Sequence, residues 1–216
     1  MSDTATTSKP AKISKKEIKA EAMKRRICAA VVCCLDELGY AETSINRIQE
    51  RAGVSRGALT HHFPTKQALV AETAMRMLRA AMRPMHAERN GGRNGPVVPA
   101  AQLLSNSWKQ VVNTAEGRAF VEIIVACRTD RALYDVLAED LQQWDAESAA
   151  TISTLYRGSQ GAPDDAALLW SISRTFFRGL LTHERFVSDP AYLARMMDRF
   201  ADIMDAHLIA RDTPKT

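Results

Sequence analysis

Side chains suited to nucleic-acid contact gather in one short stretch, GVSRGALTHHFPTK, at residues 53–66. Inside a helix, glycine costs roughly 1 kcal/mol and proline roughly 3 kcal/mol, so a long core helix is excluded here. The guanidinium of Arg56 can pair bidentately with guanine. His61 and His62 could suggest a metal site, but adjacent side chains of a helix point about 100° apart and do not easily share one ion. The residue types favour a short helix that contacts an outside surface.

The sequence does not favour an enzyme. A G-x-S-x-G match occurs at residues 53–57 (GVSRG), but it lies between two expected helices and not after the strand that a nucleophile elbow requires. No G-x-x-x-x-G-K-[ST], H-E-x-x-H or G-x-G-x-x-G motif occurs. The glycine cluster at residues 91–95 lacks the preceding strand that a phosphate-binding loop needs. We therefore expect no catalytic residues, no cofactor and no metal, with a helical enzyme as an alternative.

The cysteines define a second alternative. Cys28, Cys33 and Cys34 fall on one expected helix, Cys127 lies far away, and no C-x-x-C pair is present. This pattern is neither a disulfide framework nor a zinc site, and it is typical of reduced thiols. A thiol-based redox-sensing regulator remains an alternative, which a comparison of DNA affinity before and after oxidation would distinguish.

Composition and charge narrow the class of protein. The 216 residues are 46% hydrophobic and 25% charged, as in a globular protein of one or two domains. No apolar run approaches the ~20 residues that cross a bilayer, and the N-terminus lacks the apolar segment of a signal peptide, so we expect a cytoplasmic protein without a membrane partner. Residues 1–80 carry 14 Lys and Arg against 8 Asp and Glu. A basic N-terminal arm is a common feature of nucleic-acid binding.

Apolar spacing predicts helices along almost the whole chain. The first runs over residues 15–38, two short helices follow, and a long helix begins near residue 66 and ends before the breaker cluster NGGRNGPVVP. The expected N-caps are Thr43 or Ser44, Ser55 and Thr65, and the expected stops are Gly39, Gly53 and Pro64.

The two short helices and the turn at Gly53 have the spacing of a helix-turn-helix. Its small core is expected to contain Ile48, Ala52, Val54, Leu59 and Phe63. The outer face would then carry Arg56, Gly57, Thr60 and His61. A glycine at position 57 allows close approach to a phosphate or a base edge, because no side chain intervenes.

The segment GYAETSINRIQERAGVSRGALTHHFPTKQALV resembles the DNA-binding domain of the TetR/AcrR family of transcriptional regulators. The shared pattern is a Gly-aromatic turn, a Thr/Ser-capped helix, A-G-V-S, a short recognition helix, Phe, a Ser/Thr/Asn-Lys pair and a long linking helix, and it covers residues 20–80. The resemblance implies an all-α fold of about nine helices. Its expected parts are a disordered basic arm (1–14), a three-helix helix-turn-helix DNA-binding domain (15–64), a linking helix (65–90), a loop (91–99), and an effector-binding and dimerisation domain (100–212).

The resemblance also implies DNA contacts, which are assigned here to the residues that occupy the matching positions of the pattern. One departure occurs at Thr60, where the family commonly has a tyrosine whose hydroxyl reaches the DNA backbone; a threonine hydroxyl has a shorter reach. The implied contacts are Ser44, Asn46, Ser55, Arg56, Gly57, Thr60, His61, His62 and, on a phosphate, Lys66.

Residues 100–212 are expected to form five helices, broken at Gly117, Asp130, RGSQGAP and SDP. The last two helices have apolar stripes wider than one core requires, which favours burial against a partner. The resemblance implies a homodimer interface there and a small-molecule pocket between the middle helices. The expected interface residues are Ile172, Phe176, Leu180, Met196, Phe200 and Met204, and the expected pocket residues are Trp108, Val112, Phe120, Ile124, Trp144 and Phe177.

These expectations combine into one function. The chain would be a sequence-specific DNA-binding regulator, a repressor by analogy with the family, which binds an inverted-repeat operator as a dimer. A small hydrophobic effector would release it from double-stranded DNA.

Overall fold

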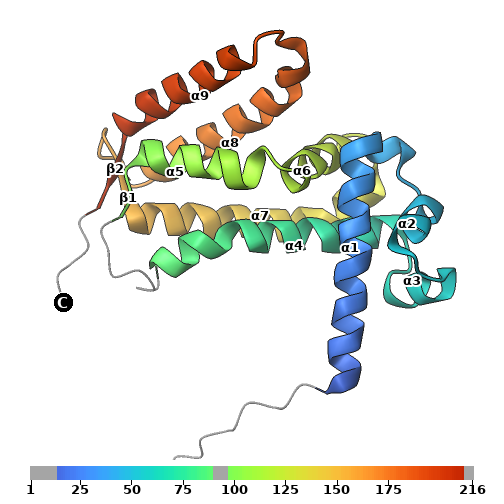
Figure 1. Cartoon of the computed structure of the whole chain (residues 1–216). Helices are drawn as coiled ribbons and strands as arrows, with labels where there is room; N and C mark the ends of the chain where they lie inside the picture. Colours follow the sequence, from blue (N-terminus) through green and yellow to red (C-terminus); the bar gives the residue numbers. More distant parts are fainter. Residues whose placement is uncertain (1–13, 90–96, 212–216) are drawn as a thin grey trace, which may run out of the picture.

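A computed structural model describes residues 14–89 and 97–211, and within these ranges the chain is almost entirely helical (Figure 1). The expected basic arm lies outside the described residues except for Ser14, which caps the first helix, and so does most of the expected 91–99 loop. No helix of the described part is long and apolar enough to cross a membrane.

Four helices form the N-terminal half: α1 (Lys15–Glu42), α2 (Ile45–Ala52), α3 (Arg56–His62) and α4 (Lys66–Arg89). Gly39 interrupts α1 with a φ of 75°, at the position where the sequence predicts the helix to end. One further turn follows it and ends at Glu42. Gly53 ends α2 in the left-handed region, which confirms the second stop.

The predicted N-caps are largely confirmed. The hydroxyl oxygens of Ser44, Ser55 and Thr65 each accept a hydrogen bond from a backbone N–H three residues later. Thr43, the alternative cap, instead donates its hydroxyl hydrogen to the Gly39 carbonyl at 2.7 Å. The helix-turn-helix is thus built by local side-chain caps, which the sequence alone displays.

The C-terminal half contains five more α-helices in the described part. They are α5 (Ala100–Ser107), α6 (Ala115–Ala126), α7 (Arg131–Leu155), α8 (Asp165–His183) and α9 (Pro190–Asp205), with a π-helical segment at Trp108–Val112 and a 3-10 turn at Glu184–Phe186. The predicted break at Gly117 is wrong, because Thr114 caps α6 and Gly117 lies in its first turn. A Cβ there would lie 1.9 Å from the Val112 carbonyl oxygen, so this glycine serves a close backbone approach.

Two strands were not predicted. Tyr156–Gly158 (β1) and Leu208–Ala210 (β2) form an antiparallel pair that ties the end of α7 to the segment after α9. Three residues are too few to display the alternation by which a strand is recognised in a sequence.

The buried side chains form two cores that cross the predicted domain boundary. The first joins α1–α4 to α6 and the start of α7, and the second joins α5, α7, α8 and α9 to the end of α4. Figure 1 shows α2 and α3 at one end of the molecule, the strand pair at the other, and α4 beside α7 between them. The helix-turn-helix therefore shares its core with the C-terminal half.

Candidate nucleic-acid interface and ligand cavity

The exposed face of α3 carries the predicted contact residues. Leu59 is buried beneath it, whereas Arg56, Gly57 and His61 are exposed. The Arg56 guanidinium forms no hydrogen bond or ion pair with any residue in the described ranges. An arginine without an internal partner is available to an external anion or base edge.

No described residue packs closely around Gly57. A Cβ added at this position would meet no atom of the described part of the chain within 4 Å, and the residue is helical. By contrast, a Cβ at Gly53 would lie 2.6 Å from the Arg26 guanidinium, which donates a hydrogen bond to the Gly53 carbonyl. The absence of a side chain at position 57 leaves space for an outside surface.

The other predicted contacts are placed unequally. Asn46 is exposed on α2, next to the cap residue Ser44. The Thr60 hydroxyl donates to the Arg56 carbonyl at 3.0 Å, so its hydrogen is used within the helix. His62 is half-buried, with its ring 6.3 Å from that of Phe63.

Lys66 differs from a free phosphate-binding cation. Its ammonium donates a 2.7 Å hydrogen bond to the Tyr40 carbonyl and lies 3.7 Å from the centre of the Tyr40 ring. Burial lowers the pKa of Lys66, and Asp130 partly offsets the effect. The contact with DNA stays a prediction, and in the structure this lysine also holds the end of α1 against α4.

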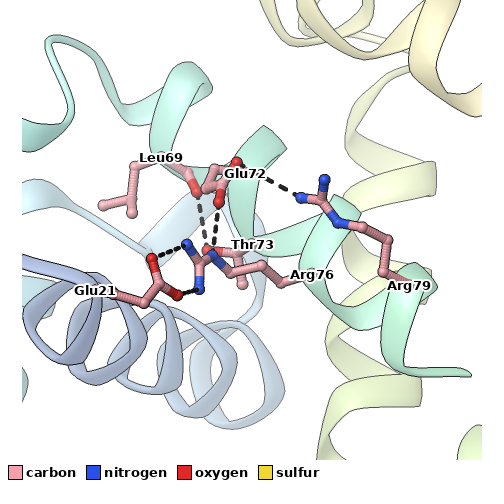
Figure 2. A network of polar contacts seen from close by, with 6 residues as sticks. All are labelled: Glu21, Leu69, Glu72, Thr73, Arg76 and Arg79. Carbon is pink, nitrogen blue, oxygen red and sulfur yellow. Dashed lines mark hydrogen bonds and ion pairs between the residues drawn. The ribbon is translucent and has the colours of Figure 1, made fainter. Parts of the chain in front are cut away.

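Arg76 fastens the linking helix to α1, as Figure 2 shows. Its guanidinium donates to Glu21 of α1 at 2.6 Å and, through Nε, to Glu72 one turn earlier on α4 at 2.6 Å. The next two residues, Met77 and Leu78, line a cavity. The helix therefore contacts α1 through one face and the cavity through another.

That cavity has a volume of about 130 Å³ and lies among α4, the π-helical segment, α6, α7 and α8. Four of the predicted pocket residues line it: Val112, Phe120, Trp144 and Phe177. Charged groups come from three lining residues, Glu116, Arg174 and Arg178. Neither Arg174 nor Arg178 was among the pocket residues predicted from the sequence, although they lie one turn apart on α8.

Two of the predicted pocket residues do not line the cavity. Trp108 is buried in the second core, with its ring 6.0 Å from that of Phe177, and acts as packing. Ile124 follows Phe120 by one turn of α6, whereas the cavity wall on this helix is formed by residues 116–121. Apolar spacing identifies a helix face but not where along it a cavity ends.

Polar contacts join α6 to the end of α1. The Arg118 guanidinium lies 2.6 Å and 3.0 Å from the two carboxylate oxygens of Asp36, and a Glu122 oxygen accepts from the Tyr40 N–H at 3.2 Å. The same helix contributes Gly117 and Phe120 to the cavity wall. Helix α6 therefore contacts both the cavity and the end of α1.

The predicted dimer residues divide into two groups. Leu180 and Met204 are buried in the core of the protomer, which leaves them little surface for a partner. Phe176 and Phe200 are half-buried and stacked at 3.9 Å on each other, Met196 is half-buried, and Ile172 is exposed. The exposed large apolar residues of α8 and α9 are Leu168, Ile172, Tyr192 and Ile203.

The cysteines do not favour redox sensing. Cys28 and Cys34 are buried and Cys127 is half-buried, and burial raises the pKa of all three thiols. A raised pKa lowers the population of thiolate, which is the form that oxidants attack.

Comparison with known proteins agrees with this geometry. Residues 27–73 match the family model described as bacterial regulatory proteins, tetR family. An uncharacterized HTH-type transcriptional regulator of Mycobacterium tuberculosis is 34% identical over 125 residues, which are 56% of this chain and 62% of that protein. The chain thus spans less than two thirds of the length of this relative.

Two further similarities extend over most of the chain. The HTH-type transcriptional regulator CymR of Pseudomonas putida is 27% identical over 186 residues, which cover 82% of this chain and 87% of CymR. A transcriptional regulator of Saccharomonospora viridis, solved in complex with choline, has a TM-score of 0.62 at 19% identity and covers 88% of this chain and 100% of its own. At that identity the structural likeness establishes the fold alone.

Proposed function

We propose that this chain, whose residues 27–73 match the model of bacterial regulatory proteins, tetR family, is a DNA-binding repressor released from its operator by a small molecule. It would act on double-stranded DNA in the cytoplasm. The observation that carries the proposal is the position of α6, which lines the cavity and is bonded to α1 beside the helix-turn-helix.

On the DNA side, α3 enters the major groove. Arg56 contacts a base edge, and Gly57 lets the helix backbone approach the duplex because nothing projects from it. Asn46 and the cap residue Ser44 approach from α2. The unpartnered guanidinium of Arg56 and the open space at Gly57 support this orientation.

The regulator acts as a homodimer through α8 and α9. Both helices expose apolar side chains that the protomer does not cover, among them Ile172 and Ile203. A two-fold dimer presents two α3 helices to two half-sites about 34–36 Å apart, so the operator is an inverted repeat.

A molecule in the cavity releases the DNA by moving α4 and α6. Both helices line the cavity and both are fastened to α1, through Arg76 and Arg118 respectively. A shift of a few ångströms in the spacing of the two α3 helices is enough to misplace one of them on its half-site. The choline in the Saccharomonospora neighbour supports a small-molecule ligand in this fold.

The test is selection of bound sequences from random DNA duplexes, followed by fluorescence anisotropy on the selected site and a shuffled one. We expect an inverted repeat, tight binding that weakens with salt, and much weaker binding of the shuffled duplex. Equal affinity for both duplexes would refute sequence-specific repression.

A further inference from the structure

Three buried polar groups belong to cavity-lining residues of α7 and α8. Trp144 and Trp170 each bury an indole N–H that has no hydrogen-bond partner among the described residues, and the same is true of the Nε–H of Arg174. All three residues line the cavity, and both tryptophans are at least nine-tenths buried. Unpaired buried donors cost free energy, so a hydrogen-bond acceptor in the cavity beside them would be favourable.

The charged groups of the cavity wall leave an excess of positive charge at Arg178. Arg174 forms an ion pair with Asp145, and Glu116 is exposed on the first turn of α6. Arg178 has no ion pair or hydrogen bond within the described ranges, and its guanidinium lies 5.7 Å from the centre of the Phe120 ring. Within the described ranges, this guanidinium therefore has no ion-paired carboxylate of its own.

We propose that this cavity binds a small aromatic carboxylate, whose anionic group pairs with Arg178 and accepts hydrogen bonds from the buried donors while its ring packs beside Phe120 and Phe177. That such a molecule is the effector rests on the proposed function.

The state of Arg178 without ligand supports an anion. Burial lowers the pKa of Arg178, the positive charge of Arg174 lowers it further, and Asp145 offsets only part of this. A carboxylate would relieve both unfavourable effects, whereas a cation would add to the repulsion by two arginines. A quaternary ammonium ligand is accordingly disfavoured, despite the aromatic residues in the wall.

The size of the cavity fits one ring. Its volume is about 130 Å³. A cavity of roughly 150 Å³ holds benzene in an engineered protein core. The remaining wall is apolar, with Leu78, Met82 and Leu181 among its members. Benzoate is therefore the simplest probe, and benzamide and benzylammonium are its neutral and cationic analogues.

The experiment is titration of the full-length protein with each probe, without DNA, followed by tryptophan fluorescence. We expect saturable quenching by benzoate and affinity for benzamide and benzylammonium lower by about tenfold or more, the loss expected for one charge-assisted contact. Equal affinity of the wild-type protein for benzoate and benzamide would overturn the proposal. So would the absence of benzoate binding at millimolar concentration.

A matched pair of variants locates the charge. Arg178→Met should lose the preference for benzoate over benzamide, and Arg157→Met, at an exposed position on β1, should keep it. Retention of the preference in Arg178→Met would overturn the assignment of the anion to this arginine. Release from the operator is measured separately. If benzoate binds with the expected charge preference but does not lower the affinity for DNA, the carboxylate site is supported. Only the claim that this ligand releases the operator is then contradicted.

Discussion

The Tyr40 hydroxyl donates a 2.5 Å hydrogen bond to Oδ2 of Asp130, which joins the end of α1 to the N-cap of α7. Asp130 also accepts from Gln67 of α4 at 3.1 Å and caps α7 through the Leu133 N–H. Three helices thus meet on one carboxylate. This contact lies between the helix-turn-helix and the C-terminal half. It therefore contributes to the stability of the packing between the two.

Tyr40→Phe should lower the free energy of unfolding by about 1 kcal/mol at neutral pH, since one charge-assisted hydrogen bond in a half-buried site is lost. The bond to Tyr40, then those to Leu133 and Gln67, lower the pKa of Asp130. A lowered carboxyl pKa contributes stability above the unfolded value of about 4 and loses it as the pH falls further. Urea titrations across this range should show the wild-type advantage shrinking in acid; a constant difference would contradict the assignment.

Gly57→Ala should weaken operator binding while the fold becomes slightly more stable. Alanine gains up to roughly 1 kcal/mol of helix propensity, and within the described ranges the added methyl group meets no atom within 4 Å. The measurement pairs a thermal melt with anisotropy on the selected duplex. Unchanged DNA affinity in a variant of raised stability would show that α3 does not approach the duplex at this position.

Arg56→Ala should lose about 1 to 3 kcal/mol of discrimination at one base position of each half-site. Lys66→Ala should weaken binding to all duplexes alike. It should also lower the unfolding temperature, because the ammonium donates a hydrogen bond to the Tyr40 carbonyl. The control is Arg128→Ala, because Arg128 is exposed but lies between α6 and α7, outside the helix-turn-helix. Specificity unaltered by Arg56→Ala, on a panel of single-base operator variants, would exclude base recognition by this residue.

Ile172→Glu should produce monomers that bind a full operator weakly, because a charge is placed on the exposed apolar face of α8. Val125→Glu, at a similarly exposed valine on α6, serves as the control and should leave assembly unchanged. Sedimentation velocity at micromolar concentration distinguishes the two. A monomeric wild type would reject the dimer itself, and a dimeric Ile172→Glu would reject this interface.

Phe120→Ala should blunt the response to a cavity ligand without loss of DNA binding, and Ile124→Ala should leave the response intact, since only Phe120 lines the cavity. Trp108→Ala should instead lower stability by about 3 to 5 kcal/mol, as expected for an aromatic residue in a core. Ligand titrations and melts on the three variants separate cavity from packing. Equal effects of the Phe120 and Ile124 changes on binding would contradict the cavity boundary.

The N-terminal elements could be predicted from the sequence because their signals are local. Ser44, Ser55 and Thr65 are caps whose bonds reach three residues along the chain, and Gly53 has the left-handed conformation that few other residues adopt. The exposure of Arg56 and Gly57 follows from the period of α3, once Leu59 is assigned to the core. Such features depend on nearest neighbours, and no distant part of the chain is needed to fix them.

Only the tertiary structure decided which apolar residues line the cavity and which are packing. Trp108 and Phe120 have the same apolar character, but the neighbouring helices bury one and leave the other beside a cavity. Leu180 and Ile172 both belong to the apolar residues of α8, yet one lies in the core and the other in solvent. The pairing of Arg174 with Asp145, which leaves Arg178 unpaired, joins positions 29 residues apart. Helical periodicity fixes a direction around one axis, and these outcomes depend on where other helices cross it.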